Sequence, residues 1–386
     1  MNSRERFLAT MAFQPVDRPP LWEFGYWAQT IRLWYQQGLP QKVGIPDSLG
    51  VAEEIRGEFL GWKWGGFLDH DVHDYLGLDP GMVRVPLNNF LHPEFERCVL
   101  EDHGDWQLVR DNYGIVRRQK KDTSTPPAFV RGPVTNREDF ERLAAERLHP
   151  TLEGRIPDDW PSFVEKTRNR DFPLSLGGSQ GFFGTLRYLL GEMGVLLGYY
   201  DHPDLMKAIA AYLADFWIAL YDQILEQVHP DVAFIWEDMS YKNGPLISPA
   251  MFGEFMLPYY RKLTGFFRDH GIKVILVDTD GDCRALIPLF IKGGVTGLYP
   301  MEATGGMDVA AVGAAHPKLQ LIGGLSKVAI SRDPEAIDQE LQAKVLPLIR
   351  RGGYIPSVDH FVPPEVSWQS FVYYRQKLAS LLSQRS

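Results

Sequence analysis

The sequence predicts an α/β protein, and specifically a (β/α)8 barrel, from three observations. From residue 173 onward, short apolar runs alternate with longer helical patterns, which is typical of βαβ units around a parallel sheet. Two further apolar runs precede this region and bring the number of expected strands to eight. Acidic side chains recur at the ends of these runs, which is where a barrel of this kind carries its functional residues.

The elements are expected in the following order. The first strand is "PLWEFGYW" (20–27), and the second ends within "GGFLDHDVHDYLGLD" (65–79). Helix start signals of the Ser-Pro and Asp-Pro type, at 248–249 and 333–334, fall between later strands. The third to eighth strands are expected at 173–178, 231–238, 273–281, 294–302, 319–327 and 352–360.

The chain between the second and third strands departs from the βα pattern. Residues 81–135 alternate in polarity and carry turn signals at "HGD" and "NYG", which is typical of small β-hairpins. We interpret this segment as a β-rich insertion. The whole chain, 1–386, is expected to form a single barrel domain around it.

Composition and charge exclude several classes of protein. With 386 residues, 45% of them hydrophobic, the chain can bury a large core. The net charge of -9 and the dispersed Lys and Arg residues argue against a nucleic-acid partner. The charged start "MNSRERFLATMAF" and the lack of long uncharged apolar runs predict a cytoplasmic protein with no membrane segment. Cys98 and Cys283 are too few for a disulfide framework or a thiolate metal cage, and a homodimer is left open.

The stretch "KVILVDTDGDC" (273–283) ends an apolar strand with acids at alternate positions. Because side chains alternate faces along a strand, Asp278 and Asp280 are expected to share one face. Neighbouring buried carboxylates raise one another's pKa unless a cation relieves them. A divalent cation could bind both acids, the two could share a proton, or a cationic group of a ligand could enter. We favour the shared proton, so that one carboxyl titrates well above about 3.9. The alternative is a strand end whose acids simply reach solvent.

The remaining candidates also stand at strand ends. A His beside an Asp, as in His360 and Asp359, can be tuned as an acid or base near neutral pH, although a structural pair is the alternative. Lys327 could bind an anionic group or neutralise Glu302. The expected catalytic residues are Glu237, Asp238, Asp280 and His360. The expected substrate-binding residues are Trp22, Glu23, Asp71, Asp278, Glu302, Lys327 and Asp359, and Ser179 ends the third strand.

Several segments follow one another in an order and spacing that is similar to a known family. They are "RERFLATMAFQPVDRPPLW", "FFGTLRYLL", "WEDMSYKNGPLISPAMFGEFMLPYYRKL", "VDTDGD", "LYPMEATGGMDV", "IGGLSK" and "GGYIPSVDHFVPPEV". Over nearly its whole length the chain resembles the uroporphyrinogen decarboxylase superfamily, which includes corrinoid-linked and coenzyme M-linked methyltransferases. The resemblance implies a distorted (β/α)8 barrel.

The chain departs from both branches of this family. The decarboxylases carry an Arg-rich RQAGRY motif after the first strand, where this sequence has "WEFGYW". The methyltransferases bind zinc through His-x-Cys-Gly and a later Cys, where this sequence has Asp278, Asp280 and either Ser357 or Val358. Oxygen ligands without a thiolate make a poor zinc site and a better site for Mg, Mn or Ca. No residue is assigned as a metal ligand, and binding of a divalent metal by the acidic ladder is left open. The resemblance also places Asp71, Tyr188 and His360 at the positions of the decarboxylases' Asp, Tyr and His.

Three functions remain open at this point. The resemblance and the missing Arg motif favour methyl transfer between a small methylated or methoxylated donor and a corrinoid carried on a partner protein. The second is decarboxylation of a porphyrinogen or a smaller pyrrole or aromatic acid. The third is a non-catalytic corrinoid- or tetrapyrrole-binding protein. The fold alone does not choose among them.

Overall fold

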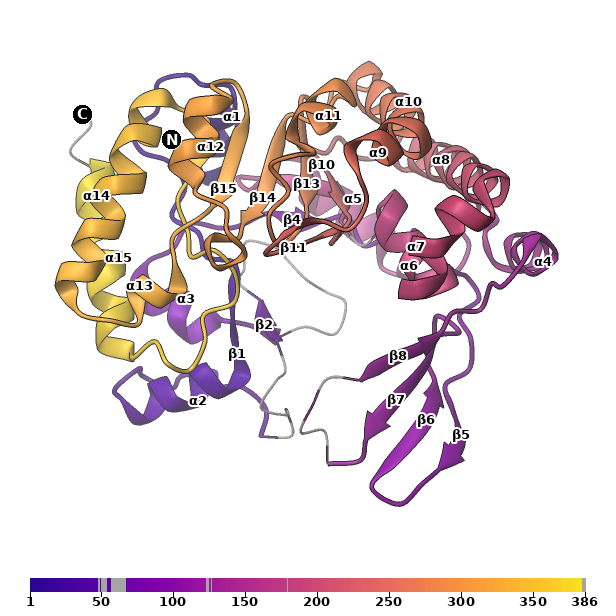
Figure 1. Cartoon of the computed structure of the whole chain (residues 1–386). Helices are drawn as coiled ribbons and strands as arrows, with labels where there is room; N and C mark the ends of the chain where they lie inside the picture. Colours follow the sequence, from indigo (N-terminus) through magenta and orange to yellow (C-terminus); the bar gives the residue numbers. More distant parts are fainter. Residues whose placement is uncertain are drawn as a thin grey trace.

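The centre of the molecule is a curled parallel sheet of seven strands (Figure 1). The computed structural model describes residues 1–47, 49, 54–56, 67–122, 125, 127–178 and 180–383. From one edge of the sheet to the other, the strands are β16 (Tyr354–Ile355), β15 (Gln320–Gly323), β14 (Gly297–Met301), β13 (Val274–Asp278), β10 (Val232–Trp236), β9 (Leu174–Gly177) and β4 (Val83–Arg84).

Each of the six apolar runs expected from residue 173 onward contains one of these strands. Their side chains alternate between two cores. In β13, Val274 and Leu276 enter the cluster inside the curled sheet, whereas Ile275 and Val277 enter the larger cluster beneath the outer helices. Burial on both faces is the reason that these strands read as continuous apolar runs.

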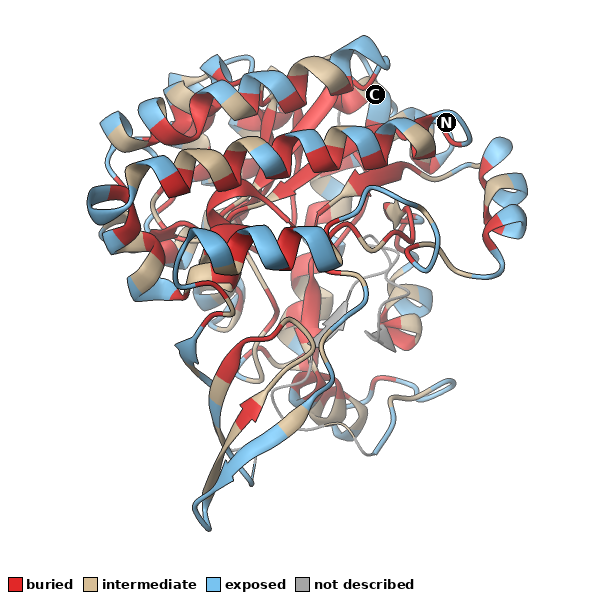
Figure 2. Ribbon diagram, turned by 90° about the vertical axis from the view of Figure 1, so that its right-hand side faces the viewer, coloured by how far each residue is buried: buried red, intermediate tan, exposed pale blue. Residues whose placement is uncertain are grey.

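The helices form the outer layer, with their buried faces toward the sheet and their exposed faces outward (Figure 2). The helix α8 (Pro203–Leu225) is long and apolar enough to cross a membrane by length and composition, but 56% of that window is buried inside the structure. We therefore assign α8 to the core. The other outer helices are α6 (Phe182–Leu190), α7 (Glu192–Asp201), α9 (Pro249–Phe255), α10 (Leu257–Asp269), α11 (Ile287–Lys292), α12 (Val309–Ala315), α13 (Lys327–Ile330), α14 (Pro334–Arg351) and α15 (Trp368–Ser383).

The amino-terminal segment contacts the curled sheet at two places, and its strand β1 (Gly25–Trp27) belongs to a separate three-stranded sheet and is not an eighth strand of the main sheet. Phe7 and Met11 of α1 (Ser3–Met11) enter the interior cluster at the end where the strands begin. The strand β1 pairs with β2 (Glu54–Arg56), which pairs in turn with β3 (Phe67–Leu68). On its other side β1 lies beside the segment after β16, because the Val362 amide donates to the Gly25 carbonyl at 2.9 Å. The helix α2 (Ala28–Gln36) follows β1.

The prediction of the second barrel strand at 65–79 was wrong. Residues of that range form β3 and the helix α3 (His70–Leu76), which ends at Gly77 in the left-handed conformation, φ 60°. Glycine is favoured at such a helix end. The strand that pairs with β9 is β4, and it contains only two residues, too few to give a periodic pattern in the sequence.

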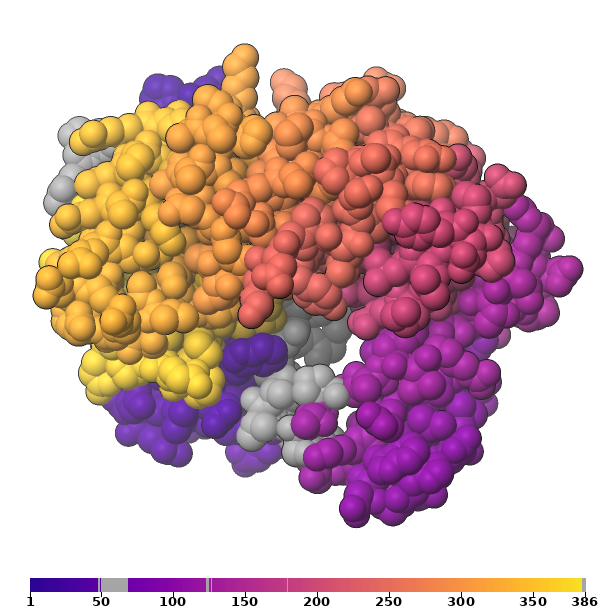
Figure 3. All heavy atoms as spheres, in the orientation of Figure 1, coloured from indigo at the N-terminus to yellow at the C-terminus, as the bar shows by residue number. Residues whose placement is uncertain are grey.

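Between β4 and β9 the chain forms an antiparallel sheet that projects from the barrel (Figure 1). Its strands are β5 (Cys98–Asp102), β6 (Trp106–Arg110), β7 (Val116–Lys120) and β8 (Ala128–Arg131). The helices α4 (Arg137–Arg147) and α5 (Trp160–Arg168) then lead back to β9. We call β5 to β8 the projecting sheet. The surface is hollowed between the barrel and the projecting sheet (Figure 3).

Candidate active site

The carboxyl ends of the barrel strands, which we call the mouth, bring together ionisable side chains from four strands. Asp238 follows β10, Asp280 follows β13, Glu302 follows β14, and His360 lies beyond β16. Glu302 and Asp238 lie close enough to Asp280 that their negative charges raise the pKa of its carboxyl. The short hairpin of β11 (Ser240–Tyr241) and β12 (Gly244–Pro245), directly after Asp238, lies on this side of the barrel (Figure 1).

Asp280 is the most perturbed of these groups. Burial, followed by the negative charges of Glu302 and Asp238, raises the pKa of Asp280 to about 7. Its Oδ2 lies 3.5 Å from Nε2 of His360, and within the described part of the chain its buried Oδ1 has no hydrogen-bond partner. The imidazole ring itself rests against Phe24, with ring centroids 4.7 Å apart. Asp280 can therefore hold or release a proton near neutral pH.

The acid ladder does not act as a single unit. Asp282 turns away and pairs with the exposed Arg284 at 2.6 Å. Asp278 ends β13, where its carbonyl oxygen accepts from the Glu237 amide at 2.8 Å. Of the ladder, Asp280 is the carboxyl with the pKa raised to about 7. The charges that raise it most are those of Glu302, after β14, and Asp238, after β10. The alternation of side chains along β13 does not predict these neighbours.

A second wall of the mouth is cationic and aromatic. Arg187 of α6 donates to Oδ2 of Asp238 at 2.7 Å and lies over the Trp236 ring, 5.3 Å from its centroid. Tyr188 stacks on Trp236 with centroids 5.2 Å apart and planes 23° apart, and burial raises the pKa of Tyr188 to about 12. Asp238 has φ 43°, a conformation that Asp and Asn tolerate better than most residues. The Tyr188 hydroxyl is therefore neutral, beside a guanidinium.

The other expected residues of the mouth are tied to one another. The Lys327 ammonium lies 3.7 Å from Oε1 of Glu302, whose Oε2 accepts from the Gly281 amide at 3.0 Å. Asp359 is buried, which raises its pKa, and it accepts from the backbone amides of Thr304 and Lys327. These contacts cross-link the loops after β13, β14, β15 and β16. Ser179 lies outside the described residues.

The structure places Glu23 and Trp22 away from the mouth. Glu23 is 1% exposed and accepts hydrogen bonds from Arg375, from the Tyr374 hydroxyl and from the Val358 amide. Trp22 stacks on Phe7 of α1 and donates to a backbone carbonyl from its indole nitrogen. Both belong to the core. The buried carboxylate of Glu23 is paired with Arg375, so its charge does not indicate a ligand site.

Asp71 is also not part of the mouth. Its carboxylate accepts from the amides of Lys42, Val43 and Gly44 and from the Tyr35 hydroxyl. Burial acts to raise the pKa of Asp71, but these hydrogen bonds outweigh it and the pKa is lowered. Asp71 therefore anchors the loop after α2. The residue that directly follows β3 is Asp69.

Glu237, an expected catalytic residue, caps a helix instead. Its carboxylate accepts from the amides of Phe182, Phe183 and Gly184, at the first turn of α6, and from the Tyr260 hydroxyl. The side chain is fully buried, and burial raises the pKa of Glu237 to about 7. Gly181, at the N-cap position of α6, has no side chain to offer, so Glu237 replaces it.

We expect Glu237→Gln to lower the free energy of unfolding by about 1–3 kcal/mol, because an amide group would face backbone donors that the carboxylate now satisfies. Chemical denaturation measures the change, and turnover per folded molecule is expected to stay within a few-fold. Loss of turnover at unchanged stability would return Glu237 to the catalytic set.

Two arginines of the site were missed from the sequence. Arg187 lies on α6, about one turn from its start, and not at the end of a strand. Arg84 ends β4, the strand that was misplaced, and its guanidinium donates to the Gly178 carbonyl at 2.5 Å, at the end of β9. Placing the second strand correctly would have brought Arg84 into the list of strand-end residues.

The residues present do not fit the zinc-thiolate site of the methyltransferase branch. Cys283 is buried behind the mouth, and burial raises the pKa of its thiol to about 12. Cys98 lies on the projecting sheet, and Ser357 and Val358 are fully buried. Across the described ranges, no group of three or more His, Cys, Asp or Glu side chains is arranged to hold a metal ion.

A family model and curated relatives indicate one family, and a solved structure shares the fold. A family model described as uroporphyrinogen decarboxylase (URO-D) matches residues 114–373. Two uroporphyrinogen decarboxylases of Pseudomonas aeruginosa, from strains LESB58 and PAO1, are each 24% identical over 380 residues, which cover 94% of this chain and 92% of theirs. The solved structure of a methyltransferase from Methanosarcina mazei has a TM-score of 0.61 and 15% identity, and covers 100% of this chain and 99% of its own. That likeness shows the barrel fold.

Proposed function

Because the chain belongs to the uroporphyrinogen decarboxylase family, we propose that it is an enzyme that transfers a methyl group from a small methoxylated donor to a corrinoid on a partner protein. The observation that carries the proposal is the state of Asp280, a half-buried carboxyl with a pKa of about 7 beside His360. Cleavage of a methyl–oxygen bond leaves a basic oxygen that needs a proton. Asp280 supplies that proton as a general acid, and His360 orients it.

The donor is held by the second wall of the mouth. Arg187 donates to Asp238 from both terminal nitrogens, and in the complex it would exchange that partner for the carboxylate of the donor. The rings of Tyr188 and Trp236 beside it suit an aromatic ring. We therefore expect a methoxylated aromatic acid as donor. Tyr113 extends the stack, with its centroid 5.7 Å from that of Tyr188.

A corrinoid held by the partner protein would supply the group that accepts the methyl. The residues of this chain do the rest. Arg187 and the aromatic stack fix the donor, and Asp280 delivers a proton from its carboxyl to the departing oxygen. The ring of His360, wedged between Phe24 and Phe361, keeps Asp280 in position.

The test follows cob(I)alamin spectroscopically after addition of the protein and a panel of methoxybenzoates. We expect conversion to the methylated corrinoid and release of the matching hydroxybenzoate in equal amounts. Methoxybenzamides, which lack the charge that Arg187 binds, are the matched control and are expected to react at least about tenfold more slowly. No methylated corrinoid with any donor would contradict the proposal.

Decarboxylation is the second candidate, and the family of the chain favours it. The same acid could protonate the carbon that loses carbon dioxide. Two cations near the mouth, Arg187 and Arg84, would have to hold the substrate carboxylates. Carbon dioxide release from pyrrole or benzoic acids, measured without a corrinoid, would support this candidate over methyl transfer.

A further inference from the structure

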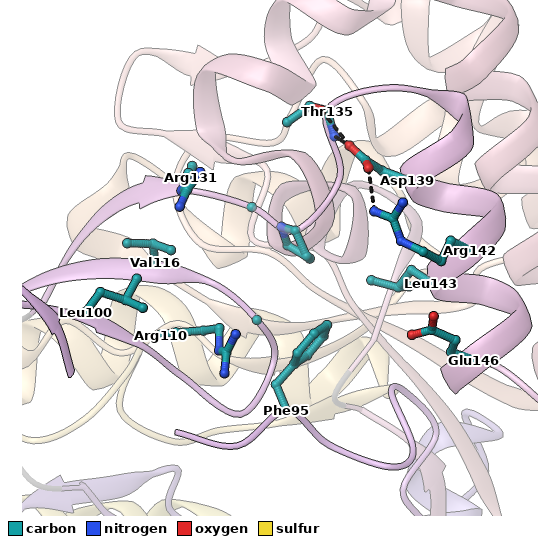
Figure 4. Close-up of a pocket in the computed structure, with 13 residues that line it drawn as sticks. Phe95, Leu100, Arg110, Val116, Arg131, Thr135, Asp139, Arg142, Leu143 and Glu146 are labelled. Carbon is teal, nitrogen blue, oxygen red and sulfur yellow. Dashed lines mark hydrogen bonds and ion pairs between the residues drawn. The ribbon is translucent and has the colours of Figure 1, made fainter. Parts of the chain in front are cut away.

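A pocket outside the mouth has the features of a ligand site. It lies between one face of the projecting sheet and α4, and its volume is about 400 Å³ (Figure 4). The side chains that define it come from both elements, with Arg110, Val116 and Arg131 on the sheet and Arg142 and Leu143 on the helix. A volume of this size matches a small organic molecule.

Two guanidinium groups on the sheet side share one face. Arg110 pairs in register with Val116, and Val116 pairs with Arg131, so the three side chains point to the same side of the sheet. Arg110 and Arg131 stand two strands apart, at a backbone separation of about 10 Å. Val116, 6% exposed, forms an apolar floor between them.

Neither arginine is neutralised by a carboxylate of the described chain. Arg110 makes only long hydrogen bonds, of 3.4 and 3.3 Å, to the Glu96 carbonyl, and Arg131 is exposed on β8. In contrast, Arg117 on the other face pairs with Asp111 at 2.8 Å. Two cations left beside a pocket are notable in a chain with a net charge of -9.

One of the two acids that line the pocket is already engaged on the helix side. Asp139 accepts from the amide and hydroxyl of Thr135 and from Arg142, at 2.6 Å for the last (Figure 4). Glu146 lines the pocket at the end of α4, and its carboxylate lies 4.0 Å from Nε of Arg147, too far for a hydrogen bond. Three arginines against two acids still leave the lining with a net positive charge.

The rest of the lining is apolar and preformed. Phe95 is held in place by Arg147, whose guanidinium lies 4.0 Å from the ring centroid. Gly114 allows this position, since a Cβ there would meet the Phe95 ring at 2.8 Å. With Leu100 and Leu143, Phe95 offers a surface for a hydrocarbon body, which an inorganic anion would not use.

We propose that this pocket binds a small organic carboxylate with an apolar ring, the carboxylate against Arg110 and Arg131 and the ring against Phe95 and Leu143. Guanidinium groups recognise planar carboxylates through paired hydrogen bonds. The site is separate from the mouth, and the proposal does not depend on the reaction that the mouth catalyses.

The experiment is isothermal titration of the full chain with benzoate, with neutral benzamide and with inorganic phosphate. We expect saturable benzoate binding that Arg110→Gln and Arg131→Gln each weaken about tenfold or more. Arg118→Gln, an exposed arginine of the same sheet that does not line the pocket, is the matched control and is expected to bind as the unaltered protein does.

Three results would overturn the proposal. They are no saturable binding of benzoate, equal binding in all four proteins, which would place the ligand elsewhere, and phosphate or benzamide binding as tight as that of benzoate. A second benzoate site at the mouth would appear as a component of the titration that persists in both pocket variants, and the loss of the other component would still support the pocket.

Discussion

Asp280→Asn is expected to lower kcat/KM by about 10²- to 10⁴-fold. The melting temperature below about pH 4, where the Asp280 carboxyl is neutral in both the folded and the unfolded chain, is expected to stay almost unchanged. The asparagine keeps the size of the side chain but cannot deliver a proton. Stability is spared because Asp280 lies at a strand end and one of its oxygens has no hydrogen-bond partner among the described residues. Steady-state kinetics and thermal unfolding on the same preparation measure the two effects.

The neighbouring acid provides the control for this variant. Asp282→Asn changes the same residue type two positions on, where the carboxylate only pairs with exposed Arg284 and its own loop. Activity is expected to be unaffected. His360→Ala, like Asp280→Asn, is expected to lose activity, because it removes the imidazole that positions the Asp280 carboxyl. A large loss of stability in either mouth variant would make that residue structural.

The pH dependence follows from the sign of the Asp280 shift. As a general acid Asp280 is active when protonated, so activity is expected to fall as pH rises through about 7. The pKa of Asp280 in the folded state lies above the ordinary value of 3.8, so the folded state binds the proton more tightly than the unfolded chain does. The resulting stabilisation is complete below about pH 4 and is lost as the pH rises to about 7. Asp280→Asn should remove both the fall in activity and the fall in stability with rising pH. If either pH dependence were unaltered in this variant, it would belong to another group.

Arg375→Met is expected to lower the free energy of unfolding by about 3–5 kcal/mol, because it leaves the Glu23 carboxylate buried without its cation. Burial already raises the pKa of Glu23, and the loss of Arg375 raises it further. Urea denaturation at neutral pH measures the change. Stability should partly return at low pH, where Glu23 becomes neutral.

A double variant separates the effect of the Glu23–Arg375 ion pair on stability from the effects of the two single residues. Glu23→Gln with Arg375→Met removes both charges and is expected to be more stable than Arg375→Met alone. The exposed pair of Asp282 and Arg284 is the comparison, and Arg284→Met is expected to cause no measurable change. If Arg375→Met were equally harmless, the buried pair would have no role in stability.

The parallel strands could be predicted from the sequence because strands that are buried on both faces are continuous apolar runs. Val274 to Val277 are all buried, two on each face. The prediction failed at β4, whose two residues carry no pattern, so Arg84 was overlooked. A strand this short is specified by its neighbours and not by its own residues.

The site was predicted only in part, for a different physical reason. Asp280 and Glu237 both follow apolar strands, and in the sequence they look alike. The structure separates them, because the Glu237 oxygens turn to the amides of the next helix and those of Asp280 turn to the mouth. A carboxylate after a strand can satisfy a helix end or a substrate, and only the position of the following helix decides.

The position of the helix α2 has a consequence for protein synthesis. The hydroxyl of Thr30 donates to the Val362 carbonyl, and the Trp34 indole donates to the Val366 carbonyl, each across 332 residues of sequence. At a ribosomal rate of about 5–20 residues per second, these partners emerge roughly 15–70 seconds after the segment that needs them. The indole of Trp34 therefore has no such partner in the nascent chain during this interval. We expect ribosome-associated chaperones to contact this region, and translation pauses between Trp34 and Val366 to increase aggregation.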